Sequence, residues 1–297
     1  MASIPMQPLT LVNEHSGELA LKVSHAAPGD NPFDHLSRFN YYSLVWVRAG
    51  TGTLRADFSD YAFGAAQLLC FSPYQPFMLA GTGPDLQLTT VQFHPDFFCI
   101  IKHQAEVACN GVLFNNIYQP PLVTLDEATA QTLAASVAGL EQELQLPAVA
   151  QHELLVAQLK ILLIHASRRK MAEFPAAGAA PLPGRPAYVL QQLRTHIEAH
   201  YRRLHSPADY AALLHLSPKA LGRFTKKHFL KTPSSLIQER IVIEAKRELY
   251  LTAKPVKQIA WELGFEDEYY FSRLFRLNAD VSPAQYRQTV GFARGQA

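Results

Sequence analysis

The chain has few cysteines and no long apolar run. Its 297 residues include only Cys70, Cys99 and Cys109, and such a sparse, odd-numbered set is typical of a reducing compartment rather than of a disulfide framework. No apolar run approaches the length that spans a bilayer. The first residues do not combine a basic head with an apolar stretch, as a secretory signal does. We therefore expect a cytosolic protein without a membrane partner.

Charge is unevenly distributed along the chain. The formal net charge is only +2, but residues 187–297 carry 17 Lys+Arg against 10 Asp+Glu, whereas residues 1–186 carry 10 against 15. A basic C-terminal part beside an acidic N-terminal part suggests that only the C-terminal part meets a polyanion. Solvated surface charge would give the same count, so charge alone does not decide between these interpretations.

Short β-rich segments separated by Gly- and Pro-containing turns fill most of residues 1–125. Some alternate polar and apolar residues with period two, and others are rich in aromatic and β-branched residues. The expected strands are residues 41–47, 53–58, 66–71 and 86–93. This pattern favours a sandwich or a small barrel.

The apolar spacing becomes helical in the middle of the chain. Apolar residues recur at helical spacing in residues 133–144 and again in 154–163, with Pro147 between them. We expect an antiparallel helical hairpin over residues 126–172, whose exposed stripe could close the barrel or pair with a second copy. Residues 173–186 are rich in Pro, Ala and Gly without apolar periodicity, which predicts a linker.

Residues 187–290 contain one structural element twice, at a period of about 50 residues. Ser217-Pro218 opens a helix, and Asp267 opens another 50 positions later. Thr232-Pro233 is echoed in the same way by Ser282-Pro283. Repetition at one period indicates a duplicated supersecondary element. We interpret it as two tandem helix-turn-helix units able to enter adjacent major grooves, held at fixed spacing by a long helix between them.

The first recognition helix is predicted to present a basic face. If Leu221 and Phe224 face the core, helical spacing places a second set of residues on the opposite side. This exposed set is Lys219, Gly222, Arg223 and Lys226. The guanidinium of Arg223 could form a bidentate contact with a guanine, and Gly222 would let the backbone approach the groove closely. The alternative is an ordinary solvated amphipathic helix.

The second recognition helix repeats this arrangement with mixed charge. Gly264 can take a positive φ in its turn, and Asp267 caps the helix that follows. The residues expected to face inward are Phe271, Leu274 and Phe275, and those expected to face outward are Glu268, Tyr269, Ser272, Arg273 and Arg276. Glu268 can accept a hydrogen bond from cytosine N4, and Arg273 mirrors Arg223. The cations assigned to phosphate are Lys226, Lys227 and Arg276.

Four short motifs occur in a highly specific order near the C-terminus. They are Ile259-Ala260, Gly264-Phe265, Tyr270-Phe-Ser-Arg273 and Ser282-Pro-x-x-Tyr-Arg287. On these motifs, the last 100 residues or so resemble the DNA-binding domain of the AraC/XylS transcription regulators. The resemblance implies promoter DNA and RNA polymerase as partners. It also implies that bases are faced by Lys219, Gly222 and Arg223 in the first unit and by Glu268, Tyr269, Ser272 and Arg273 in the second.

Three residues depart from the pattern of that family. Thr225 stands where a core Phe is usual, and Leu230 and Asp280 stand where Gly commonly ends the two recognition helices. We therefore expect altered packing or capping, more in the first unit than in the second. If one unit reads sequence less strongly, the departures predict that it is the first.

The N-terminal half is similar to the cupin-type barrel that many members of this family use for sensing. This resemblance rests on residues 42–54 and 68–76. It implies a multidomain α+β protein in which the barrel, residues 1–125, binds a small effector and the hairpin mediates homodimerisation. The candidate pocket residues are Arg38, Tyr42, Trp46, Arg48 and His94, although aromatic residues in a small barrel more often form the core.

Catalytic and metal-binding alternatives have little support in the sequence. No His-x-His pair, as metal-dependent cupins present, occurs in the first 120 residues, so we expect no metal, no cofactor and no enzymatic activity. Cys99 and His103, at i and i+4, could ligate zinc or tune a thiolate, but a buried cysteine usually acts as a small hydrophobe.

The expected function is a cytosolic, dimeric, sequence-specific transcription regulator, taken as an activator. A thiol- or metal-responsive regulator that uses Cys99 and His103 remains an alternative, as do a cupin-type enzyme with a DNA-binding tail and a non-specific architectural DNA binder.

Overall fold

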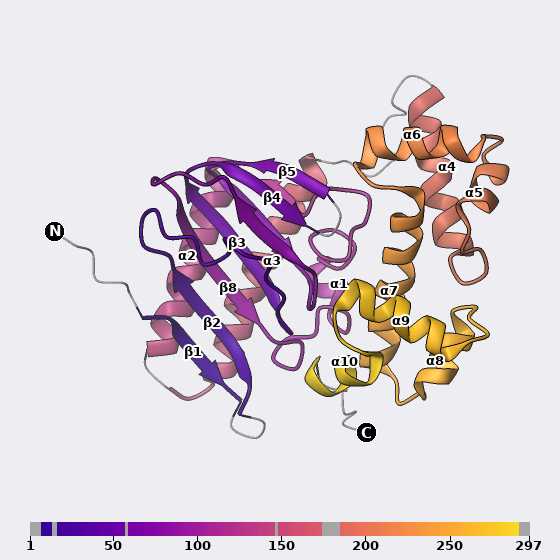
Figure 1. The fold of residues 1–297 in the computed structure, drawn as a ribbon. Coiled ribbons are helices and arrows are strands. Elements are labelled where there is room, and N and C mark those ends of the chain that lie inside the picture. Colours follow the sequence, from indigo (N-terminus) through magenta and orange to yellow (C-terminus); the bar gives the residue numbers. More distant parts are fainter. Residues whose placement is uncertain (1–6, 14–16, 57–58, 146–147, 174–184, 291–297) are drawn as a thin grey trace. The chain divides into compact units, whose positions relative to one another are not determined.

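The computed structural model describes residues 7–13, 17–56, 59–145, 148–173 and 185–290. They form two compact units (Figure 1), and each has buried apolar residues of its own. The N-terminal unit contains the strands and helices α1 to α3, and the C-terminal unit contains helices α4 to α10. No helix in the described ranges is long and apolar enough to cross a membrane.

The strands of the N-terminal unit form two sheets. The larger has the order β1-β2-β8-β3-β6-β9 and the smaller the order β5-β4-β7. Neighbouring strands run antiparallel, as where Leu44 of β3 lies opposite Val91 of β8. The bounds are β1 Leu9–Val12, β2 Leu19–His25, β3 Tyr42–Ala49, β4 Gly52–Ala56, β5 Ser59–Phe63, β6 Gln67–Phe71, β7 Phe77–Ala80, β8 Gln87–Phe93 and β9 Leu122–Thr124.

The predicted closed barrel is not observed. Within the described residues, β1 and β9 are edges of the larger sheet and β5 and β7 are edges of the smaller one, so the pairing does not close into a ring. The arrangement is a two-sheet one, which the strand pattern had equally allowed. Alternation in sequence fixes which face of a strand is buried, but it does not fix which strands pair.

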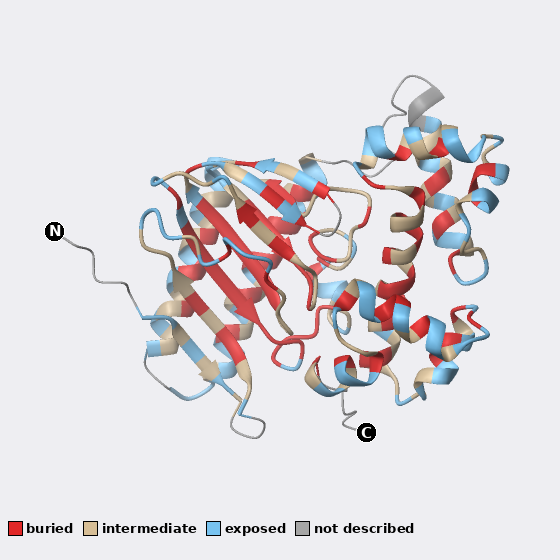
Figure 2. Ribbon diagram, in the orientation of Figure 1, coloured by how far each residue is buried: buried red, intermediate tan, exposed pale blue. Residues whose placement is uncertain are grey.

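Strand β3 separates two hydrophobic cores. Tyr42, Leu44 and Trp46 point to the core shared with helices α2 and α3. Val45 and Val47 point to the other face, where the smaller sheet packs. Figure 2 shows this central strand as almost entirely buried. A strand buried on both faces is apolar throughout, which explains why its sequence does not alternate.

Two long helices cover the outer face of the larger sheet. They are α2, Glu127–Gln145, and α3, Gln151–Glu173, which follow the short helix α1, Gln104–Val107. Glu173 fastens the end of α3 to β9, because its carboxylate accepts hydrogen bonds from the backbone N and the Oγ1 of Thr124, at 3.0 and 2.9 Å. Of the predicted linker, Glu173 thus belongs to α3 and Arg185 opens α4, while residues 174–184 lie outside the described residues.

Polar caps define the helices of the C-terminal unit. The side chains of Ser206, Ser217 and Asp267 accept hydrogen bonds from the backbone N–H groups of the first helical turns, at 3.2, 3.2 and 2.7 Å. The caps at Ser217 and Asp267 confirm the helix starts predicted there. The helices are α4 Arg185–His200, α5 Pro207–Leu213, α6 Pro218–Phe229, α7 Pro233–Leu251, α8 Val256–Glu262, α9 Glu268–Ala279 and α10 Pro283–Val290.

Arg287 gives a physical reason for the last motif of the sequence. From α10, its guanidinium donates to the backbone oxygens of Leu249, Thr252 and Lys254, at 3.2, 3.4 and 2.6 Å. These carbonyls lie at and just beyond the C-terminal end of α7, where helical carbonyls lack partners and the helix dipole favours a cation. The arginine therefore fastens α10 to the end of α7.

The structure accommodates the three residues that depart from the family pattern. Leu230 and Asp280 end α6 and α9 in the left-handed conformation, with φ of 58° and 62°, which glycine usually adopts at such ends. Thr225 is fully buried, and its hydroxyl donates to the carbonyl of Gly222 at 3.3 Å. Phe224, predicted to face the core, is only half-buried, because the apolar face of α6 is centred on Leu221 and Thr225 instead.

Leu230→Gly is expected to raise the free energy of unfolding of the C-terminal unit by about 0.5–1 kcal/mol. The left-handed conformation costs a residue with a Cβ about 1–2 kcal/mol, and the greater freedom of glycine in the unfolded chain offsets part of the gain. Asp280→Gly should give a smaller gain, since Asp tolerates this conformation better. Urea unfolding measures both, and a loss of stability in Leu230→Gly would contradict the argument.

Candidate nucleic-acid interface

Helix α6 presents a face of exposed cations. Lys219, Arg223, Lys226 and Lys227 are all exposed, whereas Leu221 and Thr225 are buried on the opposite side. Gly222 lies between Lys219 and Lys226 on this face, and a Cβ there would have no neighbouring atom within 4 Å. The face therefore has no side chain at its centre and carries positive charge on both sides of that position.

Helix α9 presents a face with both signs of charge. Arg273 and Arg276 are exposed, Tyr269 is 77% exposed, and Glu268 and Ser272 are half-buried. The opposite side, formed by Phe271, Leu274 and Phe275, is buried as predicted. Such a face offers a carboxylate acceptor, a hydroxyl and two guanidinium donors, which together match several kinds of base edge.

The cations of these two faces differ from others in the same unit. In the described part of the chain, no ion pair is formed by Lys219, Arg223, Lys226, Lys227, Arg273 or Arg276. By contrast, Arg202, Arg240 and Lys254 each pair with a glutamate at 3.0 Å or less. Unpaired cations on protruding helices are available for phosphate and base contacts.

The turns of the two helix-turn-helix units have the same backbone form. Gly264, in the second turn, has φ of +84°, as predicted, and His215 occupies the equivalent place in the first turn with φ of 54°. The sequence repeat is thus a structural repeat, in which α5 and α6 correspond to α8 and α9.

The residues predicted to line an effector pocket lie in different environments. Tyr42 is in the packed core, with its ring centroid 5.0 Å from that of Phe93 and 4.8 Å from that of Phe114. Trp46 is 6% exposed, and the guanidinium of the exposed Arg48 lies 3.9 Å above its ring.

His94 is also buried, with its Nδ1 accepting from the backbone N of Asp96 at 3.2 Å, while Arg38 is half-buried before β3. The effector pocket stays a prediction.

Cys99 and His103 have separate partners. The Sγ of Cys99 accepts from the backbone N of Lys102 at 3.4 Å, and the Nδ1 of His103 bonds Glu106 at 2.7 Å. Within the described ranges, no group of three or more His, Cys, Asp or Glu side chains could hold a metal ion. Burial raises the pKa of Cys70 and of Cys109 to about 12, so these two remain thiols at neutral pH.

Gly222→Ala is expected to separate folding from DNA binding. Alanine should stabilise α6 by about 0.5–1 kcal/mol, because glycine in a helix interior costs this much and the new methyl group meets no atom. The same methyl group should weaken DNA binding if α6 lies in a groove with Gly222 against the bases. Thermal unfolding and DNA titration measure the two effects. A more stable variant with undiminished affinity would show that Gly222 does not approach the DNA.

Sequence reasoning missed three polar residues that join the two helix-turn-helix units, Arg202, His205 and Glu244. The only signal in the sequence is that Arg240 and Arg247 flank Glu244 at i−4 and i+3 on one helix. The partners on other helices cannot be read from spacing.

Comparisons with known proteins agree with this geometry. The family model described as a helix-turn-helix domain matches residues 210–289. The HTH-type transcriptional activator RhaS of Citrobacter koseri is 32% identical over 84% of this chain and 86% of that protein, and RhaS of Klebsiella pneumoniae is 27% identical over the same shares. A crystal structure of ToxT from Vibrio cholerae is 16% identical, with a TM-score of 0.40 over 91% of this chain and 97% of that one.

Proposed function

The chain belongs to the AraC/XylS family of DNA-binding transcription regulators, and we propose that it activates transcription from promoters read by α6 and α9. The observation that carries the proposal is the pair of capped helices whose exposed cations have no partners within the described part of the protein. The relatives are named as activators, which supports the same direction here. We propose two partners in the cytoplasm. The first is promoter DNA, and the second is RNA polymerase, on which an activator acts at a promoter.

The base-facing residues divide between the two helices. In α6 they are Lys219, Gly222 and Arg223, and in α9 they are Glu268, Tyr269, Ser272 and Arg273. The cations toward the ends of these faces, Lys226, Lys227 and Arg276, bind phosphate. Lys226 and Lys227 also lie in the last turn of α6, where positive charge is favoured by the helix dipole.

Selection of binding sites from random duplexes tests this function directly. The full-length protein should enrich two half-sites whose centres lie about 10–10.5 base pairs apart, since two recognition helices on one side of a duplex meet successive major grooves. Enrichment of no sequence, with binding that depends only on salt, would instead identify an architectural DNA binder. Transcription in vitro from a selected site then shows whether RNA polymerase is activated.

The N-terminal unit is the proposed effector-binding part. Its two cores lie on the two faces of the larger sheet, and a cupin-related pocket in this unit is the finer proposal. A thermal-shift screen of small metabolites, followed by DNA binding with and without each hit, tests it. If no compound changes either DNA affinity or transcription, the sensing role is wrong.

Helix α3 supports the proposal of a homodimer. Leu154, Ile161 and Met171 are 47%, 41% and 49% exposed, and their spacings of seven and ten residues match the a and d positions of a coiled-coil seam. Ile161→Glu should therefore convert a dimer to a monomer in analytical ultracentrifugation. Gln131→Glu, on the exposed side of α2, is the control that should leave the dimer intact.

Two rivals remain, a thiol- or metal-responsive regulator and a cupin-type enzyme with a DNA-binding tail, which would also need a metal. Elemental analysis of the purified protein would detect stoichiometric zinc if Cys99 and His103 were ligands. DNA binding that is unchanged by chelator and by thiol alkylation would remove this alternative.

A further inference from the structure

The segment Tyr201–His205, which follows α4, contacts the turn of the second helix-turn-helix. The Nε2 of His205 lies 3.0 Å from the backbone O of Leu263, and its ring is stacked on Phe265 with centroids 4.5 Å apart. Burial lowers the pKa of His205 from its usual 6.5, which favours the neutral ring. Because a carbonyl only accepts, Nε2 carries the proton and donates it.

The backbone of the same segment also lies against the backbone of the second turn. At Gly264 a Cβ would lie 2.2 Å from the backbone O of Arg202, so the second turn and the α4–α5 segment are in direct backbone contact. Within the first helix-turn-helix, the hydroxyl of Tyr210 in α5 donates to the backbone O of Leu204 at 2.9 Å. The segment is therefore bonded to both helix-turn-helix units.

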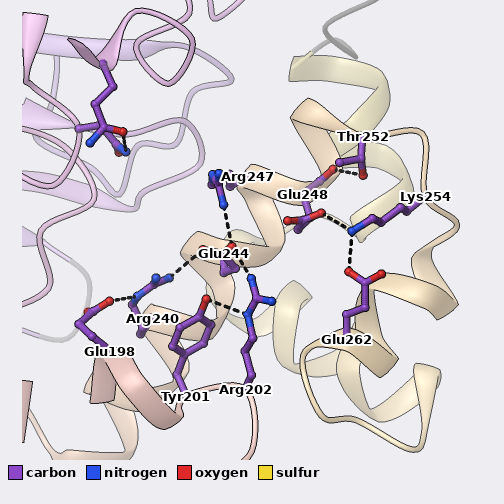
Figure 3. Close-up of polar contacts among 12 residues, drawn as sticks. Glu198, Tyr201, Arg202, Arg240, Glu244, Arg247, Glu248, Thr252, Lys254 and Glu262 are labelled. Carbon is purple, nitrogen blue, oxygen red and sulfur yellow. Dashed lines mark hydrogen bonds and ion pairs between the residues drawn. The ribbon is translucent and has the colours of Figure 1, made fainter. Parts of the chain in front are cut away.

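Glu244, in the middle of α7, adds a second connection. The residue is 4% exposed, and its carboxylate accepts from Arg202 at 3.0 Å, from Arg240 at 3.2 Å and from Arg247 at 2.9 Å (Figure 3). Burial by itself raises the pKa of Glu244, but Arg240 and Arg247 outweigh it and the pKa is lowered. The glutamate is thus held as an anion between Arg202 of the Tyr201–His205 segment and the two arginines of α7.

A third connection lies at the far end of α7. Lys254 bonds Glu248 of α7 at 3.0 Å and Glu262 of α8 at 2.6 Å (Figure 3). Near its middle, helix α7 is therefore fastened to the Tyr201–His205 segment, which is also bonded to the first helix-turn-helix. Just beyond its end, it is fastened to α8 of the second helix-turn-helix.

We propose that Arg202, His205 and Glu244 form a bridge between the two helix-turn-helix units, here called the inter-unit bridge. This bridge fixes α6 and α9 at one separation and so makes the protein discriminate operators by the spacing of their half-sites. The inference rests on the proposed function. One added base pair moves a half-site by about 3.4 Å and rotates it by about 34° around the duplex axis. If α7 alone joined the two helix-turn-helix units, the protein could bend to follow this change. Units that are joined at several points cannot bend in this way, so one recognition helix loses its contacts with the DNA.

Glu244 is a positioning residue, because it is buried and acts through the arginines that it binds. Its replacement by Gln preserves shape but removes the charge that gathers three guanidinium groups. Arg202 and Arg247 are 47% and 46% exposed, so they can turn to water when the carboxylate is lost. We therefore expect Glu244→Gln to fold and to loosen the bridge.

The test is a spacer series built on the operator selected for the full-length protein, with one base pair added or removed between the half-sites. The wild type should lose about tenfold or more in affinity at either altered spacing, the scale of one or two lost base contacts. Glu244→Gln and His205→Ala should reduce that loss to about threefold or less. Glu244→Asp, which keeps the carboxylate, should retain part of the discrimination.

Two control variants distinguish loss of the bridge from a general loss of DNA affinity or of stability. Lys227→Ala, a phosphate contact outside the bridge, should weaken binding at every spacing equally. Arg287→Ala, which destabilises the same unit by releasing α7 carbonyls, should lower the melting temperature without changing the spacing preference. If Glu244→Gln does not fold, His205→Ala decides alone.

The failures of the two proposals are distinguishable. A wild-type protein that selects no operator contradicts the proposed function. A wild-type protein that selects one and rejects altered spacing, while folded bridge variants reject it equally, overturns the inter-unit bridge.

Discussion

Gly264→Ala is expected to cost the C-terminal unit at least about 3 kcal/mol of stability and to abolish specific DNA binding. The backbone at this position has φ of +84°, and an alanine Cβ would lie 2.2 Å from the backbone O of Arg202 and 3.1 Å from its carbonyl carbon. Neither atom belongs to a flexible side chain, so the whole turn between α8 and α9 has to move. Because α9 follows this turn, its recognition face moves as well.

The internal repeat supplies the matched control. His215 is exposed and takes φ of 54° in the first turn, which shows that this turn accommodates a residue with a Cβ. His215→Gly should therefore change stability by no more than about 1 kcal/mol, and in the stabilising direction. Urea unfolding of the three proteins measures the difference. If Gly264→Ala costs only the roughly 1–2 kcal/mol of a positive φ, the contact with Arg202 is not a fixed part of the fold.

The sequence predicted the C-terminal unit better than the N-terminal one, because the signals there are local. Ser206, Ser217 and Asp267 cap helices, and a cap is determined by the next three residues. Strand pairing in the N-terminal unit depends on partners far apart in sequence, such as β2 with β8. The same residues could therefore have formed a closed barrel or the two sheets that are observed.

The error at Phe224 has a different origin. Helical spacing allows two overlapping apolar faces on α6, and the larger side chain was assigned to the core. The structure buries Thr225 instead, whose hydroxyl is satisfied by the carbonyl of Gly222. A threonine that bonds to its own helix is acceptable in a core, and hydrophobicity alone does not reveal this.

The inter-unit bridge could not be predicted for a third reason. Arg202 and Glu244 are 42 residues apart, and His205 and Leu263 are 58 apart. Ionic contacts between helices leave no periodic trace in a sequence. Two local signals point to this region, the glycine of the Gly264-Phe265 motif and the arginines that flank Glu244 on α7. Neither signal identifies a partner on another helix.

Arg273→Ala is expected to cost about 1–3 kcal/mol of DNA-binding free energy and to relax the preference at one base pair of the operator. Arg273 is exposed on α9 and has no ion-pair partner in the described residues, so its guanidinium is free to contact a guanine bidentately. Fluorescence anisotropy at fixed salt, with the selected operator and its single-base variants, measures both effects. An equal loss on every sequence would assign Arg273 to phosphate instead.

Two companion variants place that result in context. Lys227→Ala should weaken binding to all sequences and reduce the slope of log affinity against log salt by about one, as expected for a lost phosphate contact. Arg223→Ala, the equivalent of Arg273→Ala in the first helix-turn-helix, should cost less than its counterpart. The reason is that α6 carries two of the three family departures, the buried Thr225 and the left-handed Leu230. A larger loss from Arg223→Ala would mean that these departures leave sequence reading intact and that the first helix is the main reader.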